Sequence, residues 1–129
     1  VANLPPLCWL MNRVFGPRSQ SCYVTDPRII DPHLVTIGRN VIIGFGSMIA
    51  GHHQEQDRVV IQPTVIEDDV LIGGYAAISG AHIKKGAKVG AGSVVLPGSV
   101  IGEYEYWSGN PARRRQRLKQ RGDAESPKD

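Results

Sequence analysis

Aliphatic residues recur every six positions along most of this chain, and a Gly or another small residue often follows them. The repeat stops after a first run, resumes 17 residues later and contains one step of five residues instead of six. The recurring positions are Ile37, Ile43, Ile49, Ile66, Ile72, Ile78, Ile83, Val89, Val95 and Ile101. A period of six is neither the 3.6-residue repeat of a helix nor the two-residue alternation of an isolated strand.

A six-residue period fits a coil of three short, flat faces, each of which contributes one inward aliphatic residue. Gly and Asn at the corners allow bends that β-branched residues resist. Such a repeat is typical of a hexapeptide parallel β-helix, in which each coil buries its apolar side against its neighbours. The sequence therefore predicts an all-β solenoid of roughly four coils over about residues 23–109.

Three segments do not follow the repeat. Residues 5–16 are apolar and predict a short helix that caps the first coil. Residues 53–63 are polar and charged, and they predict a loop excursion from the coil. Residues 112–121 contain several strong helix formers and predict a short C-terminal helix. We expect one domain over residues 1–129, because this length suits a single core.

The composition agrees with a narrow core and excludes several classes of protein. The chain has 129 residues, of which 15 are Gly, and its hydrophobic content of 41% argues against disorder. No apolar stretch approaches the roughly 20 residues of a membrane span. Cys8 and Cys22 show no metal-binding spacing, so we expect free thiols in a reducing, cytoplasmic compartment.

Positive charge is concentrated at the C-terminal end. Residues 1–112 hold eight Lys and Arg against nine Asp and Glu, a net charge of −1, whereas residues 113–129 hold seven against three, a net charge of +4. The basic character therefore belongs to a tail. Nucleic-acid binding through residues 113–121 is one interpretation, but aromatic residues that could stack on bases are missing there.

The order of the motifs resembles the hexapeptide-repeat acyltransferases, and most of all the galactoside and maltose O-acetyltransferase group. The matching segments are Val35-Thr36-Ile37-Gly38, Val41-Ile42-Ile43-Gly44, Gly51-His52, Val65-Ile66-Glu67-Asp68-Asp69-Val70-Leu71-Ile72-Gly73, Val89-Gly90-Ala91-Gly92-Ser93-Val94-Val95 and Gly109-Asn110-Pro111-Ala112-Arg113. The resemblance implies a left-handed β-helix that forms a homotrimer, uses acetyl-CoA as co-substrate and acylates a small hydroxyl-bearing acceptor such as a sugar. We also expect apolar positions such as Val41, Val70 and Val94 to lie on outer faces that a partner would cover.

The same resemblance assigns candidate roles in acyl transfer. His52 matches the general base, a role that suits a side chain with a pKa near neutrality, although a shift of one residue would give the role to His53. Gly74 matches a backbone N–H that holds the thioester carbonyl. Asp31 is a candidate for binding the acceptor or orienting another group. The candidate coenzyme-binding positions are Gly74, Ala91, Gly92 and Arg113.

Two other functions are compatible with a hexapeptide solenoid. The first is a non-catalytic scaffold or trimerisation module, which binding of CoA would argue against. The second is a zinc-dependent carbonic anhydrase of the same fold, which needs three His ligands across an interface. His33, His52, His53 and His82 lack the spacing for such a site, so no metal is expected.

Overall fold

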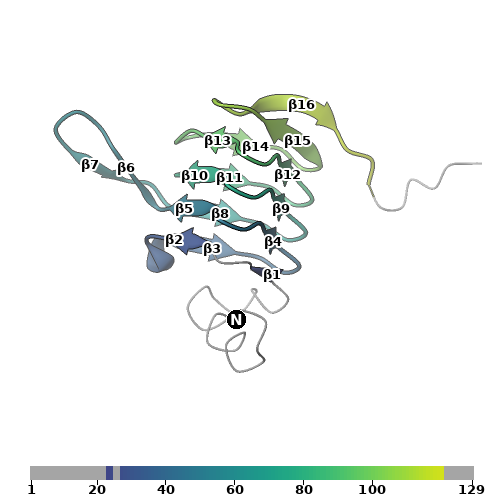
Figure 1. Ribbon diagram of the computed structural model, residues 1–129, viewed down its shortest axis with the longest axis horizontal. Coiled ribbons are helices and arrows are strands. Elements are labelled where there is room, and N and C mark those ends of the chain that lie inside the picture. Colours follow the sequence, from purple (N-terminus) through teal and green to yellow (C-terminus); the bar gives the residue numbers. More distant parts are fainter. Residues whose placement is uncertain (1–22, 25–26, 121–129) are drawn as a thin grey trace, which may run out of the picture.

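The computed structural model describes residues 23–24 and 27–120, which wind into a parallel β-helix (Figure 1). Consecutive strands of each coil lie on three different faces, and equivalent strands of successive coils pair in parallel. The all-β fold predicted from the six-residue period is therefore confirmed. The predicted N-terminal helix at residues 5–16 and both cysteines lie outside the described residues.

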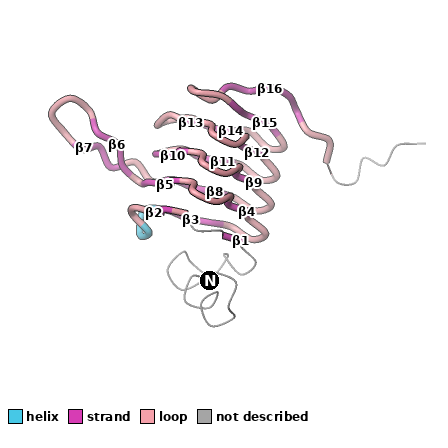
Figure 2. The backbone as a smooth tube through the Cα atoms, in the orientation of Figure 1, coloured by secondary structure: helices cyan, strands magenta, loops and turns pink. Residues whose placement is uncertain are grey.

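Three sheets form the faces of the solenoid (Figure 2). Sheet A comprises β1 (Tyr23–Val24), β4 (Ile42–Ile43), β9 (Leu71–Ile72), β12 (Lys88–Val89), β15 (Glu105–Ser108) and β16 (Arg113–Arg117). Sheet B comprises β2 (Arg28–Ile29), β5 (Met48–Ala50), β10 (Ala77–Ser79) and β13 (Val94–Val95). Sheet C comprises β3 (Val35–Ile37), β8 (Thr64–Ile66), β11 (His82–Ile83) and β14 (Val100–Ile101). A 3-10 turn, η1 (Pro32–Leu34), joins sheets B and C in the first coil.

The core consists of the recurring aliphatic residues. All ten predicted inward positions are at most 2% exposed. Equivalent residues stack from coil to coil: Ile43 of β4 pairs with Ile72 of β9, and Ile72 pairs with Val89 of β12. Because each strand contributes only one such residue, the interior is narrow and small aliphatic side chains fill it.

The outward apolar positions differ from the expectation by one residue. Val41 and Val70 are 0% and 1% exposed, so their predicted place on an outer face is wrong. They precede the inward residues Ile43 and Ile72 by two positions and therefore point to the same side of the extended chain. Among the residues of sheet A whose exposure is described, the exposed aliphatic ones are instead Ile42 and Leu71. Val94 is partly exposed, as expected.

The predicted helix at residues 112–121 is wrong over its described part, because residues 113–117 form strand β16, antiparallel to β15. The preceding turn is held against β13, where Val94 donates its N–H to Gly109 O (3.0 Å) and accepts the Ala112 N–H (2.8 Å). The chain then returns along the open edge of β15, where its backbone groups find partners. This pairing outweighs helix propensity, since a helix of about ten residues is marginal on its own.

Residues 52–61 leave the solenoid as a hairpin of β6 (His52–Gln54) and β7 (Val59–Ile61). The hairpin starts at the corner between sheets B and C and projects away from the coils (Figure 2). The corner needs Gly51, because a Cβ there would overlap Leu34 Cβ and lie 3.1 Å from Leu34 O. The chain therefore departs from the coil immediately before the two adjacent histidines.

Candidate active site

His52 lies at the root of the hairpin and contacts a carboxylate from the preceding coil. Its Nδ1 is hydrogen-bonded to Oδ2 of Asp31, which lies in the corner between β2 and η1. The same carboxylate oxygen accepts the Gly51 N–H at 3.1 Å. Asp31 and His52 are 21 residues apart in sequence, and the stacking of successive coils brings them together.

The electrostatics of this pair favour an ionised carboxylate. The hydrogen bond from His52 lowers the pKa of Asp31, and the Gly51 N–H and the nearby His52 and His33 charges act in the same direction, while desolvation opposes them. Of the two neutral imidazole tautomers, a carboxylate beside Nδ1 favours the one that carries its proton on Nδ1. The lone pair then lies on Nε2. Since the His52 side chain is 34% exposed, solvent and ligands can reach the ring.

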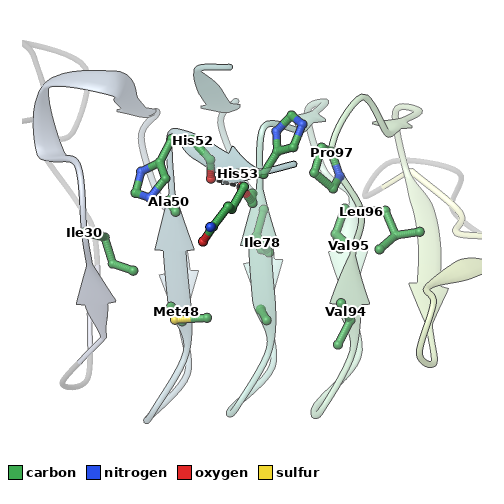
Figure 3. Close-up of a pocket in the computed structure, with 13 residues that line it drawn as sticks. Ile30, Met48, Ala50, His52, His53, Ile78, Val94, Val95, Leu96 and Pro97 are labelled. Carbon is green, nitrogen blue, oxygen red and sulfur yellow. Dashed lines mark hydrogen bonds between the residues drawn. The ribbon is translucent and has the colours of Figure 1, made fainter. Parts of the chain in front are cut away.

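A groove of about 310 Å³ runs from His52 across the outer surface of sheet B (Figure 3). Most of its lining is apolar and comes from four successive coils. The apolar lining residues are Ile30, Met48, Ala50, Ala77, Ile78, Val94, Val95, Leu96 and Pro97. The side chains of His52, His53, Gln54 and Ser79 provide the polar groups at one end. A small molecule could therefore place a reactive polar group at His52 and an apolar part along the sheet.

The structure distinguishes His52 from its neighbour. Successive side chains of an extended strand point to opposite sides, and Figure 3 shows the His53 ring directed towards Pro97. His53 Nε2 lies 3.6 Å from Glu55 Oε1, and its buried Nδ1 has no hydrogen-bond partner in the part of the chain that is described. Asp31 thus forms a hydrogen bond with His52, whereas His53 has only the more distant Glu55 carboxylate beside its Nε2.

The residues expected to hold the thioester oxygen and to contact the coenzyme lie at a different corner of the solenoid from His52. Gly74, Ala91 and Gly92 form the turns between sheets A and B, where the Gly92 N–H donates to Gly74 O at 2.9 Å. Among the described residues, no hydrogen bond uses the Gly74 N–H. Gly74 lies five residues before Ser79, whose hydroxyl contacts His52, and at about 3.3 Å per residue the separation is of the order of 15 Å. One chain alone therefore does not bring Gly74 and His52 together.

Arg113 begins β16 on the exposed surface at the C-terminal end of the solenoid. Its guanidinium donates to Ala112 O at 3.2 Å, and Ala112 is held against Val94, which lines the groove. The predicted coenzyme-binding Arg is thus close to the end of the groove remote from His52. The role of each of these residues stays a prediction.

Sequence reasoning missed one residue that contacts the site. The Ser79 hydroxyl of β10 donates to the backbone oxygen of His52 at 2.5 Å. Ser is an ordinary small residue after an inward aliphatic one, so its position in the repeat carried no signal. Only the stacking of β10 on β5, with Ser79 paired to Ala50, reveals the contact.

Neither a metal cluster nor a membrane-spanning helix occurs within the described residues. These residues contain no group of three or more His, Cys, Asp or Glu side chains arranged to hold a metal ion. None of the helical segments in this part of the chain is long and apolar enough to cross a membrane.

A family model described as bacterial transferase hexapeptide (six repeats) matches residues 63–97, which run from the end of the hairpin to the far end of the groove. Residues 63–97 of this chain thus contain the six-residue repeat that this model describes. The match agrees with the stacked coils and with the resemblance of the motifs.

Two proteins named as acetyltransferases are similar to this chain, one in sequence and one in structure. A 2,3,4,5-tetrahydropyridine-2,6-dicarboxylate N-acetyltransferase from Staphylococcus aureus is 39% identical over 79 residues, which are 60% of this chain and 31% of that protein. A hexapeptide-repeat-containing acetyltransferase from Vibrio cholerae, solved with acetyl coenzyme A, is 25% identical with a TM-score of 0.70, covering 88% of this chain and 77% of the other. This hexapeptide-repeat chain thus spans about a third of the length of the first curated relatives that it matches.

The fold also matches that of a maltose O-acetyltransferase from Clostridium difficile. The TM-score is 0.72 at 20% identity, and the alignment covers 92% of this chain and 78% of the other. At that identity the likeness shows the hexapeptide-repeat fold alone.

Proposed function

We propose that this hexapeptide-repeat protein transfers an acetyl group from acetyl-CoA to a hydroxyl of a small acceptor, with His52 as general base. The observation that carries the proposal is the Asp31–His52 pair at the end of an apolar groove. An imidazole held by a carboxylate at Nδ1 has its Nε2 lone pair free to accept a proton. The relatives named as acetyltransferases support the choice of reaction.

The reaction needs no covalent enzyme intermediate. His52 Nε2 takes the proton of the acceptor hydroxyl as its oxygen attacks the thioester carbonyl carbon. The tetrahedral intermediate collapses by breaking the carbon–sulfur bond, and the coenzyme thiolate takes the proton back from His52. Asp31 remains ionised and stabilises the imidazolium that forms between these two transfers.

The donor would contact the remaining candidate residues. We propose that the Gly74 N–H holds the thioester oxygen, that Ala91 and Gly92 allow close approach of the pantetheine arm, and that Arg113 faces the nucleotide phosphates. Because Gly74 and His52 lie at different corners of one chain, this arrangement requires a second copy. The homotrimer implied by the family resemblance would supply it.

The choice of a hydroxyl acceptor rests on the order of the motifs. These resemble the galactoside and maltose O-acetyltransferase group, whereas the Staphylococcus aureus relative is named as an N-acetyltransferase. Both hydroxyl and amino acceptors must lose a proton during attack, so the same base would serve either. A panel containing both kinds of acceptor therefore belongs in the test.

The test is a CoA-release assay over hydroxyl and amino acceptors with wild type, His52→Ala, His53→Ala and His82→Ala. We expect His52→Ala to lose about 10²–10⁴ in kcat, the usual contribution of a general base. His82 lies on sheet C and is hydrogen-bonded to Glu67 (2.6 Å), so His82→Ala should keep the wild-type rate. The rate of His53→Ala should fall between these two, because His53 lines the groove but does not contact Asp31.

Two results would contradict the proposal. Wild-type turnover by His52→Ala on the same acceptor would exclude His52 as the general base. A complete loss of turnover in His53→Ala alone would assign that role to His53. CoA should also raise the melting temperature of the wild-type protein, because a ligand that binds only the native state stabilises it. No shift at millimolar CoA, together with no turnover, would favour a non-catalytic scaffold.

A further inference from the structure

The backbone at His52 is held from the next coil as well as from the preceding one. Asp31 holds the imidazole ring and the Gly51 N–H from below, while the Ser79 hydroxyl holds the His52 carbonyl oxygen from β10 above. The two contacts act on different parts of the residue. Asp31 fixes the direction of the ring, and Ser79 fixes the peptide group that follows it.

This additional support occurs where the regular ladder ends. Up to Ala50, the strand β5 pairs with β10 in register, and Ser79 is the last partner. The hairpin then takes the chain away from the coil. Beyond the ladder, the Ser79 hydroxyl donates a hydrogen bond directly to the His52 carbonyl oxygen.

A second hydroxyl at the same corner has a different position. Thr64 is fully buried and its Oγ1 donates to Ala50 O at 2.6 Å. Ala50 O also accepts the Gly80 N–H at 3.4 Å, so it keeps one donor when the Thr64 hydroxyl is removed. Thr64 thus supports the coil two residues before His52 and contacts neither the ring nor the peptide that follows it.

We propose that Ser79 is a positioning residue for His52, and that its hydrogen bond to the His52 carbonyl keeps the imidazole between Asp31 and the groove. This inference rests on the proposed function in one respect, since a role in turnover requires His52 to be the base. Its physical content is independent of that role. The hydrogen bond from the Ser79 hydroxyl restrains the backbone of His52, the first residue of the projecting hairpin.

The mutational test compares Ser79→Ala with Ser79→Thr and Thr64→Val. Ser79→Ala should lower kcat about ten- to hundredfold, the scale expected when a reacting group is displaced by about 1 Å. Its KM for acetyl-CoA should stay within about twofold, because positioning of a base affects the transition state more than ground-state binding. Ser79→Thr keeps the hydroxyl and should restore most of the rate.

Thr64→Val is the matched control for a merely structural effect. It removes a hydroxyl that caps a carbonyl at the same corner and should lower the melting temperature at least as much as Ser79→Ala, while kcat stays close to wild type. Equal losses of kcat in both variants would overturn the proposal. If Ser79→Ala does not fold, Ser79→Cys keeps the size with a weaker donor and should show a smaller loss in the same direction.

A spectroscopic measurement separates this inference from the proposed function. In ¹⁵N-labelled protein without substrate, the Nδ1–H proton of His52 should give a protected resonance in wild type and in Thr64→Val, and should broaden or exchange faster in Ser79→Ala. An unchanged resonance in Ser79→Ala would overturn the role of Ser79, whatever the turnover. Full activity of His52→Ala would instead refute the role of His52 as general base. The resonance measurement would still test whether Ser79 positions His52.

Discussion

The clearest test of the fold compares two isoleucines that are adjacent in β4. Ile43 is fully buried, whereas Ile42 is 44% exposed on the outer surface of sheet A. Ile43→Ala and Ile42→Ala remove the same three carbon atoms from the same strand. The difference between the two variants therefore measures the contribution of the inward position alone.

The expected magnitudes follow from burial. Three methylene equivalents at about 0.8 kcal/mol each correspond to about 2.4 kcal/mol of transfer free energy. At Ile43 the cavity left between stacked coils adds to this, so the free energy of unfolding should fall by about 3–4.5 kcal/mol. At Ile42 roughly half of the side chain is already in water and no closed cavity forms, so we expect about 1 kcal/mol.

The assay is thermal and urea unfolding of both variants at one protein concentration, because any self-association makes the melting temperature depend on concentration. For a domain of this size, we expect Ile43→Ala to lower Tm by about 15 °C and Ile42→Ala by about 5 °C. Equal losses would refute the assignment of inward and outward positions. A larger loss for Ile42→Ala would show that the outer surface of sheet A is buried in solution.

Two further predictions concern the site. Asp31→Asn should lower kcat about tenfold or more, because it removes the charge from a charge-assisted hydrogen bond, and CoA release measures this. The pKa of Asp31 is lowered in the folded protein, so its ionised form contributes stability above the unfolded pKa of about 4, and this contribution is lost as the pH falls through the folded value. The difference in Tm between wild type and Asp31→Asn should accordingly be greatest near neutral pH and shrink below about pH 4, and a constant difference would contradict the pairing. Gly92 has φ +66°, and a Cβ added there would meet no atom within 4 Å. Gly92→Ala should therefore cost only about 1 kcal/mol of backbone strain, while a rise in KM for acetyl-CoA would support its contact with the coenzyme.

Much of the fold could be predicted because the solenoid repeats a local rule. Each inward aliphatic residue, from Ile37 to Ile101, occupies the equivalent place on its face of the coil, so the period alone identifies the core. A candidate base was also readable, since the Gly-His pair stands where the repeat stops. The period does not say where side chains of different coils meet. For that reason, only the structure could reveal the contact between Asp31 and His52 and the contact of Ser79 with the His52 backbone.

The sequence by itself determined the six-residue repeat, the inward residues and the pair of histidines at the departure of the hairpin, because these depend on spacing and residue type within one coil. The tertiary structure decided what depends on neighbouring coils. It turned residues 113–117 into a strand, because the open edge of β15 offered hydrogen bonds that a short helix could not match. It also distinguished His52 from His53, because the corner of the preceding coil presents a carboxylate to only one side of β6.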